Sequence, residues 1–364
     1  MARPARAPAA PHVDQFHPTL SFGDAVGNQI LSLQRLLRDL GYKSDIYCEH
    51  LPDHFQGRAR PISEYPRAGS AERVLLAHFG LLYSQPVMDW LARVSAHKVL
   101  IYHNITPHTY FDGLDLALSE SARRGREQLD LLRPLVQAGW GDSTYNVDEL
   151  AARGWTRLGV LPIVFDPERY AVRPSRRVLR RWNSGLNVLF VGRVAPHKRH
   201  EDLIRVFCYL KRRVRPDSRL LLVGSTRGME RYVASLQALV QRRGLSDVVF
   251  VGHVGAPEWV ACYRCASVYL SMSEHEGFGV PLLEAMYFGV PVIARKAAAV
   301  PETLGGAGLL LTARNDAATA ELIALLDEDR ALRERVVARQ RERLQAFMPD
   351  RVRGRLEQLL QDLG

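Results

Sequence analysis

The sequence predicts an α/β protein made of two doubly wound parallel sheets. Short apolar runs with β-branched residues alternate with amphipathic stretches along the chain, which is the order of βαβ units. A chain of 364 residues is long for one domain and sufficient for two. Residues 166–184 are rich in Pro, Arg and turn-forming residues, and we expect them to link the two halves.

In the first half, short apolar runs predict strands, and amphipathic stretches between them predict helices. The expected strands are residues 12–17, 44–49, 73–78, 98–103, 139–143 and 157–162. The expected helices are residues 27–40, 85–94 and 114–136. Gly41 follows the first of these helices, where a glycine commonly ends a helix.

The second half repeats this alternation more clearly. The expected strands are residues 187–191, 219–223, 248–251, 268–270 and 291–294. The expected helices are residues 200–213, 229–243, 257–265 and 281–288. Ligands of parallel sheets bind at the carboxyl ends of the strands, so functional residues are expected directly after strands.

The composition is that of a globular protein, with 47% hydrophobic and 24% charged residues. No apolar run reaches the roughly 18–20 residues of a membrane-spanning helix. Residues 1–10 lack an apolar stretch followed by a cleavage site, so we interpret them as a disordered tail. A cytoplasmic location is therefore expected, and peripheral contact with the inner face of the membrane is a further possibility.

The four cysteines do not predict a disulfide framework or a zinc site. Cys262 and Cys265 form a CxxC pair, while Cys48 and Cys208 lie far from it. No second CxxC or histidine pair supplies the remaining zinc ligands. The pair is therefore expected on one helix, with one or both side chains packed as small apolar groups.

The net charge of +10 is concentrated in two clusters of cations. The first cluster is Arg176, Arg177, Arg180 and Arg181, and the second is Lys211, Arg212, Arg213 and Arg215. A solvated basic surface and attraction to anionic lipid both explain them. Nucleic acid is ranked last and is not expected as a partner, because basic and aromatic residues are not interleaved.

A first candidate phosphate-binding segment follows the expected strand 187–191. Gly192 permits a tight turn, and Arg193 and Lys198 place two cations near the start of the next helix. Fixed cations beside a helix N-terminus suit a diphosphate. Two solvated cations in a surface loop are the alternative explanation.

A second candidate segment, Ser-Glu-His-Glu-Gly-Phe-Gly-Val-Pro-Leu-Leu-Glu-Ala-Met, occupies residues 273–286 after another strand. Gly277 and Gly279 let the backbone approach a ligand, and Pro281 suits the first turn of a helix. Glu276 and Glu284 bracket the start of that helix, and carboxylates accept hydrogen bonds from sugar hydroxyls. Alternatively, Glu284 interacts with the helix dipole and Glu276 is an exposed loop charge.

Together these segments resemble the signature of family 4 retaining glycosyltransferases. The resemblance rests on Glu276 and Glu284 with seven residues between them, including Gly-Phe-Gly-Val-Pro, and on residues 192–198 upstream. Residues 291–294 and 300–302 fit the same pattern. The segments occur together and in the expected order, which makes the combination specific.

The resemblance covers residues 187–311 best and implies a GT-B fold, in which two Rossmann-like domains face each other across a cleft. It implies an N-terminal acceptor-side domain of residues 1–167 and a nucleotide-sugar-binding domain of residues 168–345. A C-terminal helix within residues 346–364 would return to the first domain.

The resemblance also implies roles for individual residues. Arg193 and Lys198 would bind the donor diphosphate, Glu276 the hydroxyls of the transferred sugar, and Glu284 the ribose. The residues that would line the sugar-phosphate site are Gly277, Phe278, Gly279 and Val280. In the first half, His103 ends a strand at a place where family members often carry a histidine near the reacting sugar. A structural role for His103 is the alternative.

The loop after the first expected strand is the counterpart of a glycine-rich loop near the donor phosphates in this family. Here it has two separated glycines, Gly23 and Gly27, and Gly27 is preferred as the donor contact. Asp24 caps the first helix or contacts the acceptor, and the cap is preferred. His197 and His253 are expected to be loop residues, and Glu302 a first-turn acid of a helix.

Neither a cofactor nor a metal is expected. Asp112 and Asp115 are too far apart for the DxD metal motif of the other main glycosyltransferase fold, and no other carboxylate pair resembles a metal cage. The predicted activity is retaining transfer of a hexose from a nucleotide sugar to a glycan or lipid-linked acceptor in surface polysaccharide or lipopolysaccharide synthesis. Mannose from GDP-mannose is favoured, by family resemblance alone.

Two alternatives to transfer stay open at this stage. One is another enzyme of the same architecture, such as a nucleotide-sugar epimerase, which would convert its donor without an acceptor. The other is a catalytically silent protein that binds carbohydrate or lipid.

Overall fold

The computed structural model describes residues 11–21, 24–66 and 70–363. By its internal contacts the chain forms two compact units. The first unit comprises Met1–Ile105, Arg124–Val164 and Pro349–Gly364, and the second comprises Thr106–Arg123 and Phe165–Met348. The domain limits expected from the sequence stay a prediction about the independently folding parts of the chain.

The first unit contains a parallel sheet of seven strands in the order β3-β2-β1-β4-β5-β6-β7. Its strands are β1 (His12–Thr19), β2 (Ile46–His50), β3 (Arg60–Pro61), β4 (Arg73–Phe79), β5 (His97–Tyr102), β6 (Ala138–Gly141) and β7 (Leu158–Val160). Its α-helices are α1 (Ala25–Asp39), α2 (Gln85–Arg93), α4 (Thr144–Ala152), α13 (Pro349–Gln361) and the second part of α3 (Leu116–Leu132).

The second unit contains a parallel sheet of six strands in the order β10-β9-β8-β11-β12-β13. Its strands are β8 (Asn187–Val191), β9 (Arg219–Val223), β10 (Val248–Gly252), β11 (Val268–Ser271), β12 (Val292–Arg295) and β13 (Leu309–Leu311). Its helices include α5 (Arg176–Trp182), α6 (His200–Tyr209), α7 (Glu230–Arg242), α8 (Ala256–Cys265), α9 (Val280–Tyr287), α10 (Val300–Leu304), α11 (Asp316–Glu328) and α12 (Arg330–Leu344).

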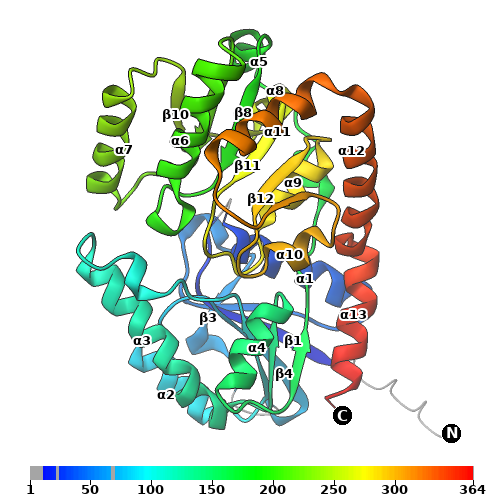
Figure 1. The fold of residues 1–364 in the computed structure, drawn as a ribbon. Helices are drawn as coiled ribbons and strands as arrows, with labels where there is room; N and C mark the ends of the chain where they lie inside the picture. The colour runs from blue at the N-terminus through cyan, green and yellow to red at the C-terminus, as the bar shows by residue number, and fades with distance from the viewer. Residues whose placement is uncertain (1–10, 22–23, 67–69, 364) are drawn as a thin grey trace, which may run out of the picture. The chain divides into compact units, whose positions relative to one another are not determined.

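The last helix completes the core of the first unit. Leu356 and Leu359 of α13 are buried in one apolar cluster with Leu33 of α1 and Ile101 of β5. Figure 1 shows α13, in red, beside the dark-blue α1. Gly159 of β7 allows this packing, because a Cβ there would lie 2.5 Å from the side chain of Leu359. The C-terminal segment therefore belongs to the first hydrophobic core although it follows the second unit in sequence.

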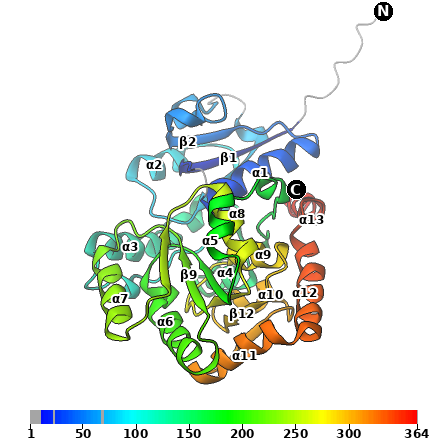
Figure 2. The ribbon, with the colours of Figure 1, turned by 90° about the horizontal axis from the view of Figure 1, so that it is seen from above.

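In the second unit the central strands are buried on both faces. Every residue of β8 and of β11 is buried, as expected for parallel strands covered by helices on both sides. Helix α6 packs against α11 on one of these faces, and the two helices lie side by side in Figure 2. The carboxyl ends of the strands are then left for loops.

The alternating pattern predicted the sheets correctly, and the differences are local. The helix expected at residues 114–136 ends at Leu132, since Pro134 cannot donate a backbone hydrogen bond. The helix expected at residues 200–213 changes into a π-helix at Leu210–Val214. The expected linker contains a 3-10 turn at Pro167–Tyr170 and helix α5. Helices α4, α11 and α12 and the short strands β3 and β13 were not predicted.

Candidate active site

In the second unit, two loops at the carboxyl edge of the sheet lie in contact. Strand β8 pairs with β11, so the loops that follow them leave the same edge. The backbone N–H of Glu274 donates to the carbonyl of His197 over 2.8 Å. Nearby, Lys198 Nζ lies 2.6 Å from Glu276 Oε1, and both side chains are mostly buried. The structure thus joins the predicted diphosphate-binding lysine to the predicted sugar-binding glutamate.

An ion-pair network holds these loops in place. Arg199 adopts a left-handed backbone conformation, with φ of 54°, directly before α6. Its Nε lies 2.9 Å from the fully buried Asp202 and 3.7 Å from Glu274 of the second loop. Asp202 also forms ion pairs with Arg205 and Arg314. Buried carboxylates need such partners, so the network ties the first loop to both α6 and the second loop.

Glycine is required at two points of this edge. Gly279 precedes α9 with φ of 95°, and a Cβ there would lie 2.9 Å from the side chain of Leu282. Gly224, after β9, packs so closely that a Cβ would lie 1.9 Å from the carbonyl oxygen of Gly192. Gly224 therefore brings the loops after β8 and β9 together, and Gly279 permits the turn into α9.

Two residues predicted to bind the nucleotide-sugar donor have side chains that contact other groups, away from the Lys198–Glu276 pair. Arg193 is exposed, and its Nη2 donates to the carbonyl of Arg227 over 3.1 Å. The ring of Phe278 is buried against Phe347 at a centroid distance of 5.4 Å. Phe278 would therefore offer a ligand its backbone. Gly277 and Gly279 flank it, and Val280 is the first residue of α9. The donor contacts of all these residues stay predictions.

Glu284 is buried on α9 and is held by two tyrosines. Its Oε1 accepts from the Tyr170 hydroxyl over 2.7 Å, and its Oε2 accepts from the Tyr263 hydroxyl over 2.6 Å. Burial raises the pKa of the Glu284 carboxyl, and the two hydrogen bonds oppose this rise. Because the residue is 1% exposed, a ribose would reach it only after a neighbouring side chain moved. The ribose contact of Glu284 stays a prediction.

His197 and His275 are buried beside the Lys198–Glu276 pair. Their ring centroids lie 6.3 Å apart, and Tyr110 packs against both rings. Burial, together with the charge of Lys198, lowers the pKa of His197 to about 2. His197 is thus a neutral packing residue of a 3-10 turn, whereas the sequence suggested a loop residue.

In the first unit, His103 follows β5 as the centre of a buried polar chain. Its Nδ1 lies 2.8 Å from Asp142 Oδ2, and its Nε2 lies 2.9 Å from His78 Nδ1. His78 Nε2 lies 3.0 Å from Gln15 Oε1. The chain therefore links the ends of β4, β5 and β6 to the middle of β1.

The start of α1 carries the other predicted residues of this unit. Asp24 accepts from the backbone N–H groups of Val26 and Gly27, so the preferred cap is confirmed. A Cβ at Gly27 would lie 2.7 Å from the carbonyl oxygen of Ser21, so glycine is needed there. Gly23 lies outside the described residues. The donor contact of Gly27 stays a prediction.

Comparisons with known proteins support the family inferred from the sequence. Residues 175–343 match the family model described as glycosyl transferases group 1. This part of the chain belongs to that family. A D-inositol 3-phosphate glycosyltransferase from Nocardia farcinica is 30% identical over 280 residues, which are 71% of this chain and 61% of that protein. The resemblance to this family that the sequence predicted is confirmed.

Two mannosyltransferases match shorter parts of the chain. The O-antigen chain mannosyltransferase B of Escherichia coli is 33% identical over 39% of this chain and 37% of its own length. A GDP-mannose-dependent alpha-(1-6)-phosphatidylinositol monomannoside mannosyltransferase from Mycobacterium tuberculosis is 31% identical over 54% and 56%. In each case the matching region spans less than two thirds of the relative.

Solved structures match the fold over nearly the whole chain. Anabaena HepE in complex with UDP-glucose has a TM-score of 0.75 at 17% identity, covering 97% of this chain and all of that chain. The alpha,alpha-trehalose 6-phosphate synthase from Burkholderia multivorans has a TM-score of 0.73 at 11% identity, covering 97% and 99%. The GT-B fold class is therefore confirmed.

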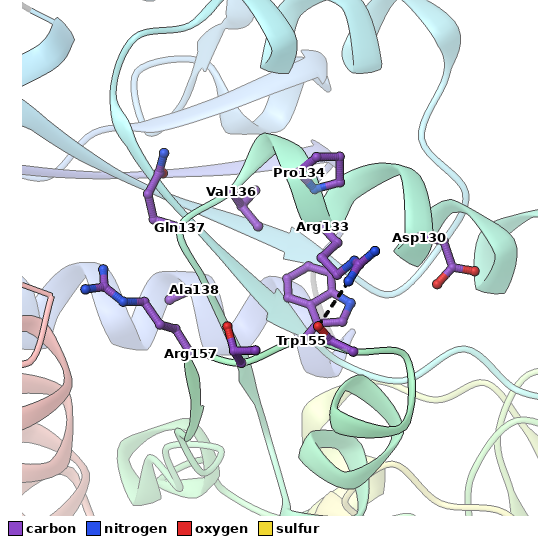
Figure 3. A pocket seen from close by; sticks show the side chains of 10 residues that line it. Asp130, Arg133, Pro134, Val136, Gln137, Ala138, Trp155 and Arg157 are labelled. Carbon is purple, nitrogen blue, oxygen red and sulfur yellow. Dashed lines mark hydrogen bonds between the residues drawn. The ribbon is translucent and has the colours of Figure 1, made fainter.

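A cavity of about 400 Å³ in the first unit lies at the amino ends of β6 and β7. It is lined by residues that precede β6 and β7, among them Gln137, Trp155 and Arg157. Figure 3 shows Arg133 over Trp155, donating to the carbonyl of Gly154 at 3.1 Å. Ligands of such sheets bind at the carboxyl ends, so this cavity is separate from the candidate site.

The CxxC pair lies on one helix, as expected. Cys262 is buried on α8 and Cys265 is partly buried at its end. Within residues 11–21, 24–66 and 70–363, no three His, Cys, Asp or Glu side chains gather as a metal site would require. In the same ranges no helix is long and apolar enough to cross a bilayer. Metal independence stays a prediction.

Several residues that build the site were not predicted from sequence. These residues contact partners that are distant in sequence, so local spacing does not indicate their roles. They are Tyr170, Tyr263, His78 and Asp142. Two positions could have been found from their place in the sequence. Asp142 directly follows β6, and Gly224 directly follows β9, where functional residues of parallel sheets are expected.

We expect Tyr263→Phe to destabilise the protein by about 1–3 kcal/mol, because a buried carboxylate oxygen loses its donor. Tyr287→Phe on α9 is the matched control, since Tyr287 is 37% exposed, and its stability should change little. Thermal melting and urea unfolding measure both variants. In a Glu284→Gln background the effect of Tyr263→Phe should shrink, because the charge is gone. An equal loss in both backgrounds would contradict the contact.

Proposed function

We propose that this protein transfers a hexose from a nucleotide-sugar donor to a glycan or glycolipid acceptor, with retention at the anomeric carbon. The observation that carries the proposal is the contact between Lys198 and Glu276, 78 residues apart in sequence. It unites a cation suited to phosphate with a carboxylate suited to sugar hydroxyls at the carboxyl edge of one sheet.

The Lys198–Glu276 pair also explains how a donor would enter. Each side chain neutralises the other in the described conformation. A donor diphosphate would replace Glu276 as the partner of Lys198, and sugar hydroxyls would replace Lys198 as the partners of Glu276. Binding would then exchange one set of charge-assisted hydrogen bonds for another, without leaving a charge unpaired in a mostly buried site.

In the transfer step the bond between the anomeric carbon and the diphosphate oxygen breaks, and the acceptor oxygen forms a new bond on the same face. Lys198, Arg193 and the N-terminus of α9 would stabilise the charge that develops on the departing diphosphate. The acceptor proton would pass to that phosphate. No protein base is then needed.

Among donors we favour GDP-mannose. The support is similarity to mannosyltransferases, one of which is named for its dependence on GDP-mannose. An acceptor in surface polysaccharide, lipopolysaccharide or glycolipid synthesis fits the same relatives. An epimerase is the second candidate, and only the shared fold supports it. Such an enzyme would convert the nucleotide sugar without an acceptor.

A screen of nucleotide sugars by thermal melting tests the donor. A ligand bound only by the folded state stabilises by about 2.7 kcal/mol at a hundredfold excess over its Kd. We expect GDP-mannose to raise the melting temperature more than UDP-glucose, GDP or UDP. A larger shift with UDP-glucose than with GDP-mannose would reassign the donor.

Glu276→Gln and Glu284→Gln separate the sugar and ribose roles. Loss of the Glu276 charge should lower kcat by about tenfold or more, because its hydrogen bonds orient the reacting sugar. Glu284→Gln should mainly weaken binding of the nucleoside diphosphate, which lacks the sugar. Initial rates and calorimetric titration with the nucleoside diphosphate measure the two effects.

The exposed Glu321→Gln on α11 serves as the control for these variants and should leave both measurements unchanged. If Glu276→Gln lost nucleoside-diphosphate affinity and Glu284→Gln did not, the two roles would have to be exchanged. Wild-type rates of zero with every donor, despite tight binding, would favour a silent binding protein.

Contact with an anionic membrane is a further part of the proposal, and it rests on the first basic cluster. Arg176, Arg177 and Arg180 of α5 are exposed. The second cluster is partly neutralised, since Arg215 pairs with Asp327 and Lys211 with Asp247. The exposed cluster is therefore the better candidate for lipid phosphates.

We expect binding to vesicles with anionic lipid at low salt and loss of binding as salt screens the charges. Replacing Arg177 and Arg180 by Ser should weaken binding, whereas Arg215→Ser should change it less, because Arg215 is already paired. Sedimentation with vesicles measures these differences. Equal binding to neutral and anionic vesicles would rule out the electrostatic contact.

A further inference from the structure

The buried chain Gln15–His78–His103–Asp142 fixes the positions of its protons. Gln15 Nε2 donates to the carbonyl of Ile30 over 3.0 Å, which orients the amide and directs Gln15 Oε1 at His78. An amide oxygen only accepts, so His78 Nε2 must carry a proton. All four side chains are buried, so water does not replace these partners.

The next link determines the proton on His103. Burial, with His103 and His17 nearby, lowers the pKa of His78 well below its usual value, so His78 is neutral. A neutral ring with a proton on Nε2 has a bare Nδ1, which accepts. The proton between the two histidines therefore belongs to His103 Nε2, 2.9 Å away.

The other nitrogen of His103 faces a carboxylate. His103 Nδ1 lies 2.8 Å from Asp142 Oδ2, and the second oxygen of Asp142 has no hydrogen-bond partner among the described residues. A buried carboxylate without a donor is costly, so a proton must lie between Asp142 and His103, and it belongs on the imidazole, which is the more basic of the two groups. Both ring nitrogens of His103 then carry protons.

We propose that His103 is held as an imidazolium paired with Asp142, and that Gln15 and His78 are positioning residues that keep it in this state. Both N–H groups of His103 are then used inside the protein. His103 would act as a fixed cation that neither takes up nor releases a proton. The role of this cation in catalysis rests on the proposed function. The charge state of His103 does not depend on it.

The titratable groups around His103 come from several elements of the first unit. His78 of β4 and Asp142 after β6 contact its ring, His17 of β1 lies close enough for its pKa to respond to His103, and Asp24 before α1 acts on His17. Burial lowers the pKa of His17 to about 4, so His17 is neutral as well. Asp142 is the carboxylate in direct contact with the His103 ring.

Nuclear magnetic resonance of the ring nitrogens of His103 tests the charge state without any substrate. Loss of its signals in His103→Gln gives the assignment. We expect both nitrogens to be protonated in the wild type up to about pH 8.5, where a free histidine is neutral. One unprotonated nitrogen in the wild type at neutral pH would overturn the proposal.

Gln15→Met tests the positioning role. It lets His78 move its proton to Nδ1 and donate to His103 Nε2, so His103 should become neutral on raising the pH. Gln34→Met is the matched control, because Gln34 is a buried glutamine that donates to the Ser44 carbonyl outside this chain. It should leave the His103 spectrum unchanged. An identical His103 spectrum in Gln15→Met and wild type would refute the positioning role.

Sugar-transfer rates give a separate readout. In Gln15→Met, kcat should fall by on the order of tenfold or more between about pH 6.5 and pH 8.5, following the loss of protonated His103. The wild-type kcat should not fall over this pH range. If no transfer is found but the nitrogens behave as expected, the proposed function fails and the charge assignment stands.

Discussion

The pairing of β8 with β11 is the constraint on which the candidate active site of the second unit depends. Val188 aligns with Val268 and Leu189 with Tyr269, so both strands point their carboxyl ends the same way. The backbone hydrogen bond from Glu274 to His197 then closes the two loops on each other. Without this strand pairing, the loops that carry Lys198 and Glu276 would not lie close enough for the two side chains to contact each other.

The loops are held by charges that are themselves buried. Asp202 is fully buried with three arginines around it, and Arg199 extends from this group to the second loop. Removing one partner of such a network leaves an uncompensated charge, which costs more than the contact itself contributes. The geometry of Lys198 is thus set by groups that do not touch a donor in our proposal.

The sequence predicted what depends on periodicity and on local spacing. Strands 187–191 and 219–223 were placed to the residue, since continuous apolar runs bounded by turn formers leave little choice. Helix ends were less certain, because the π-helix at Leu210–Val214 has no distinct local signal. The side-chain partners of Glu284 and His103 were beyond sequence reasoning, since they depend on which distant strands become neighbours.

Both units place a buried carboxylate at the carboxyl ends of their strands, but they neutralise it differently. Glu284 accepts hydrogen bonds from two tyrosine hydroxyls, which hold the side chain in place. Asp142 faces a single histidine, and the amide of Gln15 fixes the direction of every proton in that chain. A transferase whose acceptor proton leaves with the phosphate has no need of a side-chain base. A histidine locked in its charged form is compatible with that chemistry, whereas a mechanism that required His103 to accept a proton would first have to break the chain.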